Sequence, residues 1–113
     1  MCTRAQLDII EKEMVEAFQK YYGDRLVKVY LYGSYARGDN TEYSDVDIAG
    51  IVKGDRLELQ KILHLIIDVA CEIGLDNETV IAPTVIPYDE FTEMREVLPY
   101  YHNIYTEGVE LSA

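Results

Sequence analysis

Apolar residues recur at three- and four-residue spacing over residues 3–22, and this pattern predicts an amphipathic helix. The apolar stripe consists of Leu7, Ile10, Met14, Phe18 and Tyr21 or Tyr22. Thr3 stands where the helix begins, and Gln6 completes a T-x-x-Q capping box with it. Residues 55–73 are apolar over more than one face, so a second, well buried helix is expected there, with Gly74 as its C-cap.

Three further segments are rich in β-branched and aromatic residues, and they predict strands at residues 26–32, 45–52 and 79–86. One face of the first strand carries Val27, Val29 and Leu31. The opposite face carries Lys28, Tyr30 and Tyr32. Because Pro83 has no backbone N–H to donate, it places the third strand at a sheet edge or at a bulge.

Two short helices are expected at residues 88–97 and 99–106, and the tail at 108–113 is expected to end as a short extended piece. The order is then helix, strand, strand, helix, strand, helix, helix. No repeat or linker interrupts it. The sequence therefore predicts one domain over residues 1–113, with a small α/β or α+β fold in which helices flank a single mixed sheet.

The chain has 113 residues, with 21 acidic and 10 basic side chains and a formal net charge of −11. This balance disfavours direct binding to a nucleic-acid backbone, and it leaves room for a cation or a basic protein partner. No signal peptide and no apolar run of about 18 residues is visible, so no membrane association is expected. Cys2 and Cys71 lack metal-ligand spacing, which is typical of reduced thiols in a cytoplasmic protein. The sequence does not decide whether the chain forms a homo-oligomer.

The stretch GSYARGDNTEYSDVDIAG, residues 33–50, carries the candidate chemistry. Gly33 ends the first strand, and a glycine there lets a ligand approach the backbone closely. If a helical turn begins at Ser34, its free N–H groups face the same space and favour an anion such as phosphate. A plain strand-to-helix turn with a serine cap also explains the Gly-Ser pair, so the phosphate hypothesis needs further support.

Asp45 and Asp47 supply that support. Residues two apart on a strand project to the same face, about 6.5 Å apart along the chain, so both carboxylates can bind one hard cation. Mg²⁺ is typically held by one or two carboxylates, while water and substrate phosphates fill its other positions. The alternative is a pair of surface charges at the strand edge, and two like charges there are unfavourable without a counter-ion.

Arg37 lies three residues after Ser34, in the loop between the turn and the aspartates. Its guanidinium can bind a phosphate through two hydrogen bonds. A surface ion pair with Asp39 or Glu42 is the alternative. The sequence does not separate the two.

Gly33-Ser34, ten intervening residues and Asp45-Val46-Asp47 form a GS-x10-DxD motif. This motif and the fuller pattern GSYARGD…SDVDI resemble the polymerase-β-type nucleotidyltransferases, in particular their minimal nucleotidyltransferase (MNT) branch of MntA-like antitoxins. The ending NIYTEGVEL, residues 103–111, resembles the N-I-x-x-E-G-x-x-L close of these small domains. The resemblance covers most of the chain and implies the polymerase-β-like nucleotidyltransferase fold.

The resemblance implies a role for each motif residue. Gly33, Ser34 and Arg37 would bind the triphosphate of ATP. Asp45 and Asp47 would be the catalytic residues and would ligate one or two Mg²⁺ ions, which bridge the phosphates and orient an attacking hydroxyl. The product would be a nucleotidyl group, in the first instance adenylyl, on an acceptor.

The sequence departs from this family at a third carboxylate, which these transferases carry on a later strand, often in the context V-D-L-V. The matching strand here is TVIAPTVIP, residues 79–87, and it contains no acid. The expected position falls near Pro83. Asp76 and Glu78, just before the strand, are weak substitutes. The base that would deprotonate the acceptor is therefore missing from its expected place.

The resemblance also implies a partner. In the MNT branch this is commonly an all-helical HEPN-domain protein in a toxin–antitoxin arrangement, with this chain as the antitoxin-like member. Two other functions stay open, namely an inactive module that neutralises its partner by contact and a sensor that binds ATP without transfer. The ten tyrosines, including the YYHNIY cluster at residues 100–105, either pack at the rim of the core or form a contact surface for a partner or a base.

Overall fold

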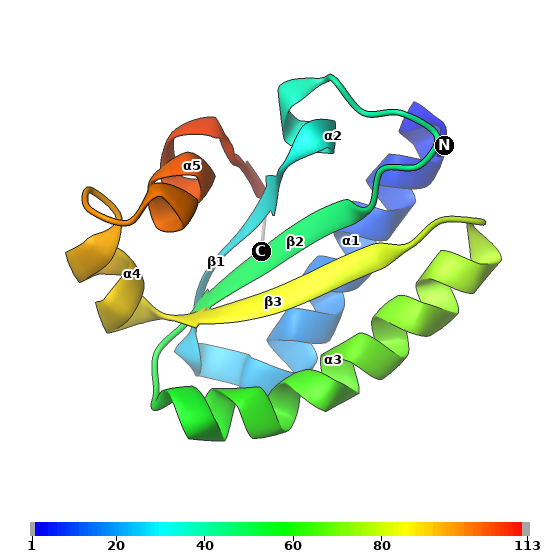
Figure 1. Ribbon diagram of the computed structural model, residues 1–113. Coiled ribbons are helices and arrows are strands. Elements are labelled where there is room, and N and C mark those ends of the chain that lie inside the picture. Colours follow the sequence, from blue (N-terminus) through cyan, green and yellow to red (C-terminus); the bar gives the residue numbers. More distant parts are fainter. Residues whose placement is uncertain (1, 112–113) are drawn as a thin grey trace.

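The computed structural model describes residues 2–111 as a four-stranded mixed sheet with helices on both faces (Figure 1). The elements are α1 (Arg4–Tyr22), a 3-10 turn (Gly23–Arg25), β1 (Leu26–Tyr32), α2 (Ser34–Arg37), β2 (Val46–Val52), α3 (Arg56–Asp76), β3 (Ile81–Pro87), α4 (Tyr88–Met94), α5 (Pro99–Glu107) and β4 (Val109–Leu111). The long helices α1 and α3 cover one face of the sheet, while α4 and α5 lie across the other. The predicted α+β fold with one mixed sheet is confirmed.

Helix α1 begins where the sequence predicts. The Gln6 N–H donates to the Thr3 hydroxyl at 3.1 Å, and the Thr3 N–H donates to the Gln6 side-chain oxygen at 2.9 Å, so the capping box is formed. The apolar stripe packs against α3 and the sheet, and Ile10, Met14 and Phe18 are fully buried. This burial, more than intrinsic helix propensity, stabilises a helix of this kind.

The strand order is β3-β2-β1-β4. β1 runs antiparallel to β2 and β4, whereas β2 and β3 are parallel and are connected through α3. β3 is an edge strand, which confirms the expectation from Pro83. The predicted extended tail is β4, while its last two residues, 112 and 113, lie outside the described residues.

Each face of the sheet contributes to a separate hydrophobic core. Val29 and Leu31 of β1 pack under α1 and α3, whereas Tyr30 packs under α4 and α5. The expectation that Val27 shares the face of Val29 is wrong, because the register of β1 shifts at a bulge between Leu26 and Lys28. An extra residue at a bulge turns the following side chains over, and Val27 therefore packs on the Tyr30 side.

Several helices and strands begin or end at other residues than the sequence predicts. β2 begins at Val46, so Asp45 precedes the strand instead of opening it. α3 continues to Asp76 and is capped at Asn77, so Gly74 lies inside the helix. A Cβ at Gly74 would lie 2.6 Å from the Thr79 carbonyl oxygen, which shows that the glycine makes room for the chain returning into β3. α4 ends three residues before the predicted position.

Among residues 2–111, no helix is long and apolar enough to cross a membrane. Both cysteines are free thiols. Cys2 is buried, and its N–H donates to the Tyr35 hydroxyl at 3.4 Å, while Cys71 is exposed on α3. The two thiols therefore do not cross-link the fold.

Candidate functional site

The end of β1 lies beside the beginning of β2, and this register brings the two predicted motifs together (Figure 1). Tyr32, the last residue of β1, pairs with Asp47 of β2. Gly33 then turns the chain into α2, which begins at Ser34 as predicted. The carbonyl oxygen of Gly33 accepts hydrogen bonds from two N–H groups of this helical turn, each at 3.1 Å.

Gly33 is held against the Asp47 carboxylate. Its φ of 76° is in the region that favours glycine, and a Cβ built there would lie 2.3 Å from the Asp47 Oδ2. Any side chain at residue 33 would therefore both strain the backbone and displace the carboxylate. The sequence assigned Gly33 and Asp47 to two parts of one site, and the structure brings them into contact.

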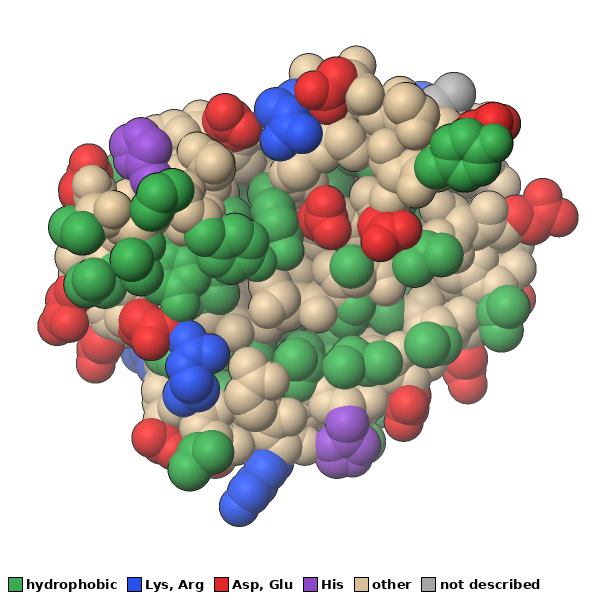
Figure 2. Space-filling model, viewed as in Figure 1, with side chains coloured by type: hydrophobic (Ala, Val, Ile, Leu, Met, Phe, Trp, Pro, Cys, Tyr) green, Lys and Arg blue, Asp and Glu red, His purple; other side chains and the backbone are tan. Residues whose placement is uncertain are grey.

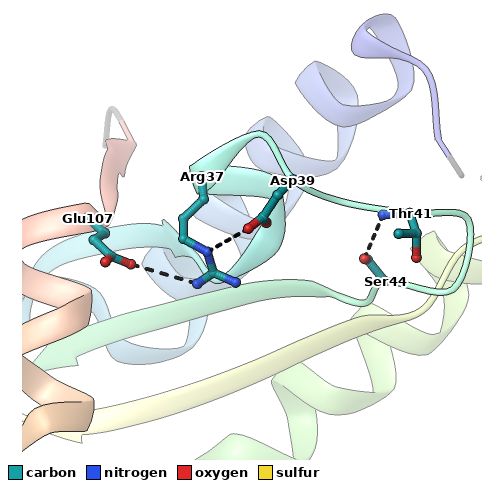
Figure 3. Close-up of polar contacts among 5 residues, drawn as sticks. All are labelled: Arg37, Asp39, Thr41, Ser44 and Glu107. Atoms are coloured by element: carbon teal, nitrogen blue, oxygen red, sulfur yellow. Dashed lines mark hydrogen bonds and ion pairs between the residues drawn. The ribbon is translucent and has the colours of Figure 1, made fainter.

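The loop before β2 presents Asp45. Thr41 and Ser44 close a turn in which the Thr41 N–H donates to the Ser44 hydroxyl at 2.9 Å and the Ser44 N–H donates to the Thr41 carbonyl oxygen at 3.1 Å (Figure 3). Asp45 follows this turn directly and is exposed. The turn therefore fixes where the first aspartate enters the site.

Asp45, Asp47 and Arg37 interact electrostatically. Asp47 is half-buried, while the neighbouring Val46 and Ile48 point into the core on the other face. Burial raises the pKa of the Asp47 carboxyl above its usual value of 3.8, and the charge of Asp45 raises this pKa further. Arg37 opposes both effects and lowers the pKa of Asp47. The ionised pair is thus short of positive charge, which one arginine only partly supplies.

This donor set fits a hard divalent cation. Two carboxylates on one side leave the other positions of Mg²⁺ to water and to phosphate oxygens, which is the usual arrangement at nucleotide sites. Among the described residues, no group of three or more His, Cys, Asp or Glu side chains gathers that could hold a metal by itself. The two carboxylates would therefore fill only part of the coordination of such an ion.

A family model for the nucleotidyltransferase domain matches residues 11–101, which include both the Gly-Ser turn and the aspartate pair. The chain belongs to this nucleotidyltransferase family. MJ0604 of Methanocaldococcus jannaschii, by name a candidate protein adenylyltransferase, is 31% identical to it over 97 residues, covering 86% of this chain and 89% of the relative. MJ0141 of the same organism, a second candidate protein adenylyltransferase, is 37% identical over 81 residues, covering 70% of this chain and 80% of the relative.

Solved structures of toxin–antitoxin complexes have the same fold. A variant of the MntA–HpeT complex superposes with a TM-score of 0.56 at 15% identity, over 91% of this chain and 73% of that chain. A toxin–antitoxin complex with AMP-PNP gives a TM-score of 0.55 at 17% identity over the same shares. At such identities the likeness shows the fold alone. The family model confirms the expected nucleotidyltransferase family, and the likeness to MntA is a likeness of fold.

The nucleotidyltransferase domain has no acid on β3 beside the aspartate pair. In the parallel register, Asp47 pairs with Ala82 and Ala49 pairs with Thr84, so Ala82 and Thr84 are the β3 residues on the site face. Pro83, near which the sequence placed the third carboxylate, belongs to the opposite face. Neither of the suggested substitutes, Asp76 and Glu78, joins the aspartates in a metal-binding group among the described residues.

Arg37 of this nucleotidyltransferase domain lies between two carboxylates (Figure 3). Its Nε donates to Asp39 Oδ2 at 3.2 Å, and its Nη1 is 3.7 Å from Glu107 Oε2 at the end of α5. Of the two surface partners considered for it, the structure therefore has Asp39, and Glu107 takes the place of Glu42. All three side chains are half-exposed, so water and phosphate oxygens can reach the guanidinium.

Helix α5 forms a second wall of the site, which the sequence did not predict. A cavity of about 200 Å³ separates Gly33 and Arg37 from α5. The α5 residues that line it are Tyr100, Asn103, Ile104 and Glu107. The Tyr32 and Tyr100 hydroxyls are 2.8 Å apart across the cavity, and burial together with this hydrogen bond raises the pKa of Tyr32. The only sequence feature that could have pointed to α5 as part of the site is the N-I-x-x-E-G-x-x-L ending.

Two of the larger hollows elsewhere on the described residues have volumes of about 390 and 430 Å³. One lies between α1 and β4, and the other between α1 and α3. Neither contains a residue of the GS-x10-DxD motif. Size alone therefore does not locate the site of this domain, and the motif geometry does.

We expect the variant Glu107→Gln to bind Mg²⁺-ATP roughly two- to fivefold more tightly, the range that exposed ion pairs contribute. Glu107 pairs with Arg37, so it would compete with a phosphate for the guanidinium and would repel a triphosphate. Isothermal titration calorimetry at low salt measures the change. Glu110→Gln removes a similarly exposed charge that pairs with Lys28, so it should leave the affinity unchanged. Weaker binding by Glu107→Gln would mean that Glu107 holds Arg37 in its binding position.

Proposed function

We propose that this chain is a magnesium-dependent nucleotidyltransferase of one domain that transfers the adenylyl group of ATP to a partner protein. The observation that carries the proposal is the half-buried Asp47 carboxylate, which lies against Gly33 and within electrostatic reach of Asp45 and Arg37. The partner would be a small helical HEPN-type protein, and the chain would act as its antitoxin. The two free thiols are in keeping with a cytoplasmic location.

The relatives support the group transferred and the kind of acceptor. MJ0604 and MJ0141 are candidate protein adenylyltransferases by name. Among the structural neighbours, one toxin–antitoxin complex contains AMP-PNP, and in another two aspartates two positions apart are replaced by glutamate. The same spacing separates Asp45 and Asp47, which favours a shared use of the pair.

In the proposed reaction a hydroxyl of the acceptor attacks the α-phosphorus of ATP. The bond from this phosphorus to the oxygen that bridges it to the β-phosphate breaks, pyrophosphate leaves with the bonding electron pair, and the hydroxyl proton passes to solvent water. Bound Mg²⁺ would neutralise the charge that develops on the phosphates. Asp45 and Asp47 supply the carboxylate oxygens that this ion prefers.

The remaining motif residues bind the triphosphate. Because Gly33 has no side chain, phosphate oxygens can approach the first N–H groups of α2, which have no carbonyl partner within the helix. Arg37 exchanges its carboxylate partners for a phosphate, with which the guanidinium forms stronger, bidentate hydrogen bonds. The residues of the motif would thus orient the α-phosphorus toward the hydroxyl of the acceptor.

Mass spectrometry of the acceptor tests the proposal. The chain, Mg²⁺, ATP and the purified HEPN-type protein are incubated together, and the partner is expected to gain the mass of one AMP for each transfer. EDTA should prevent the gain. A partner that stays unmodified although the chain is folded and binds Mg²⁺-ATP would exclude the transferase function.

A second candidate function is neutralisation of the partner by binding, without turnover. The observation that favours it is the lack of an acid at Ala82 and Thr84, the two positions of β3 that face the site. Without a base, the acceptor hydroxyl keeps its proton. Complex formation with an unmodified partner would be the expected result.

A carboxylate restored on β3 distinguishes slow from absent turnover. In the V-D-L-V context two apolar residues follow the acid, and Val85 and Ile86 follow Thr84 in the same way. We therefore expect Thr84→Asp to raise the transfer rate at least about tenfold, since general base catalysis contributes about 100- to 10,000-fold. Thr84→Asn is the control of matched size. An unchanged rate in the aspartate variant would place the base outside β3.

A further inference from the structure

Four consecutive apolar residues are exposed where α4 is joined to α5. They are Val97, Leu98, Pro99 and Tyr100. Val97 is 68% exposed, Leu98 39% and Tyr100 50%. Runs of three to four exposed apolar residues are unfavourable on a surface unless they serve binding, because they remain hydrated and promote aggregation.

The exposed run is not a displaced part of the core. The apolar face of α5 is already buried through Tyr101 and Ile104, which pack with Phe91 of α4. The Val97 and Leu98 N–H groups both donate to the Met94 carbonyl oxygen, at 3.0 and 2.8 Å. The run is therefore held in a defined shape and presents its side chains outward. Preorganised surfaces lose less conformational entropy on binding.

The run continues into the nucleotide site. Tyr100 lines the cavity beside Gly33 and Arg37, and its hydroxyl is 2.8 Å from that of Tyr32. The opposite rim of this cavity, formed by Arg37 and Asp39, is charged and exposed. A protein that must bring a hydroxyl to the nucleotide covers one of these rims. Of these two rims, the α4–α5 rim offers apolar area for burial, whereas the other presents the charged side chains of Arg37 and Asp39.

Charges around the run define the partner further. Glu93 and Glu96 are exposed just before it, and Glu107 is exposed at the far end of α5. Tyr105 is also exposed, and the Arg95 guanidinium stacks on its ring at 4.1 Å. Figure 2 shows apolar side chains gathered over the α4–α5 side of the molecule, with acidic side chains around their edge. A complementary surface has an apolar centre and a basic rim.

We propose that Val97, Leu98, Pro99, Tyr100 and Tyr105, here called the 97–105 surface, dock the acceptor protein beside the nucleotide. This inference rests on the proposed function, because it assumes a protein acceptor. The acceptor presents an apolar patch to the run and Lys or Arg side chains to the surrounding carboxylates. Aromatic residues at the centre of such a patch contribute most of the binding energy.

A competing apolar patch lies on the opposite side of the sheet. Leu75 and Val80 are 81% and 61% exposed and line a hollow of about 320 Å³ between α3 and the start of β3. None of the residues that line this hollow also lines the cavity beside Gly33. This patch therefore provides a control of matched exposure.

The double variant Val97→Ser with Leu98→Ser tests the docking surface. Both side chains are exposed and neither lines the cavity, so Mg²⁺-ATP affinity should be unchanged. Leu98 is the N-cap of α5, where serine is favoured, so the variant should be at least as stable as the wild type. Calorimetry with the purified HEPN-type protein, without nucleotide, is expected to show at least about tenfold weaker binding, because two apolar side chains that would be buried against the acceptor are lost. In the transfer assay, KM for the acceptor should rise by the same factor while kcat stays constant.

The control variant Leu75→Ser with Val80→Ser should bind the acceptor as the wild type does. Equal binding by the Val97→Ser/Leu98→Ser variant, or loss of binding only in the control, would overturn the proposal. Sedimentation analysis that shows a wild-type dimer dissolved by the first variant would also overturn it, since the surface would then join two copies. A complex that forms through this surface but transfers no AMP upholds the docking surface and contradicts the transferase function alone.

Discussion

Replacement of Asp47 by asparagine is expected to lower adenylyl transfer by roughly 100- to 1,000-fold, because metal-assisted charge stabilisation contributes several kcal/mol at such sites. The variant keeps the shape of the side chain and removes the charge that binds the cation. Mg²⁺-dependent ATP binding, measured by calorimetry, should be lost together with transfer. Asp89→Asn removes an exposed acid in the first turn of α4 and should leave both unchanged.

The same variant is expected to be more stable than the wild type when no metal is present. The pKa of Asp47 is raised above 3.8 in the folded protein, chiefly by burial and then by Asp45. An ionised Asp47 therefore costs folding free energy at neutral pH, and this cost disappears as the pH falls through the raised pKa towards 3.8. Asp47→Asn removes the cost at every pH.

Thermal unfolding in EDTA measures how much an ionised Asp47 lowers the stability of the metal-free protein. At pH 7 the melting temperature of Asp47→Asn should exceed that of the wild type, and the difference should shrink on acidification. Mg²⁺ with ATP should raise the melting temperature of the wild type only, because a ligand stabilises the state that binds it. A variant that melts below the wild type at pH 7 would mean that the ionised carboxylate stabilises the empty site.

Gly33→Ala is expected to destabilise the protein by about 2–6 kcal/mol, the sum of a backbone conformation that essentially only glycine adopts and an overpacked contact. The φ of residue 33 is 76°, and the added Cβ would lie 2.3 Å from the Asp47 Oδ2. Relief of this clash moves the carboxylate away from the Gly-Ser turn. Mg²⁺-ATP binding should therefore be lost even at temperatures where the variant is fully folded.

Gly38→Ala is the matched control for this prediction. Gly38 has a φ of 80° and no neighbour within 4 Å of its Cβ position. Its replacement should cost only the backbone part, about 1–2 kcal/mol, and should preserve nucleotide binding. Denaturant unfolding and calorimetry measure the two effects separately. If Gly33→Ala and Gly38→Ala bind Mg²⁺-ATP with the same affinity, the contact between Gly33 and Asp47 is not required for nucleotide binding.

Local patterns predicted much of the fold. The capping box of Thr3 and Gln6 and the edge position implied by Pro83 depend on a few neighbouring residues or on one missing N–H group, and both predictions are confirmed. The C-cap at Gly74 failed for a different reason. Its glycine is needed for the approach of Thr79 from the next segment, and a helix pattern does not contain that contact.

The geometry of the candidate site was predictable where its residues are close in sequence. The spacing of Gly33, Asp45 and Asp47 indicated a metal and phosphate site, and the antiparallel register of β1 and β2 brings these residues together. The contact of Arg37 with Glu107 spans most of the chain, and it depends on how α5 packs over the sheet. No local pattern encodes such a distance, so the second wall of the site emerged only from the fold.

The most direct test of the central claim follows two labels of ATP into the partner protein. One reaction uses ATP labelled at the α-phosphate and the other uses ATP labelled at the γ-phosphate, each with Mg²⁺, the chain and the HEPN-type protein. Adenylyl transfer predicts that the partner gains the α label and that the γ label leaves with pyrophosphate. Appearance of the γ label on the partner, or of neither label, would contradict the account.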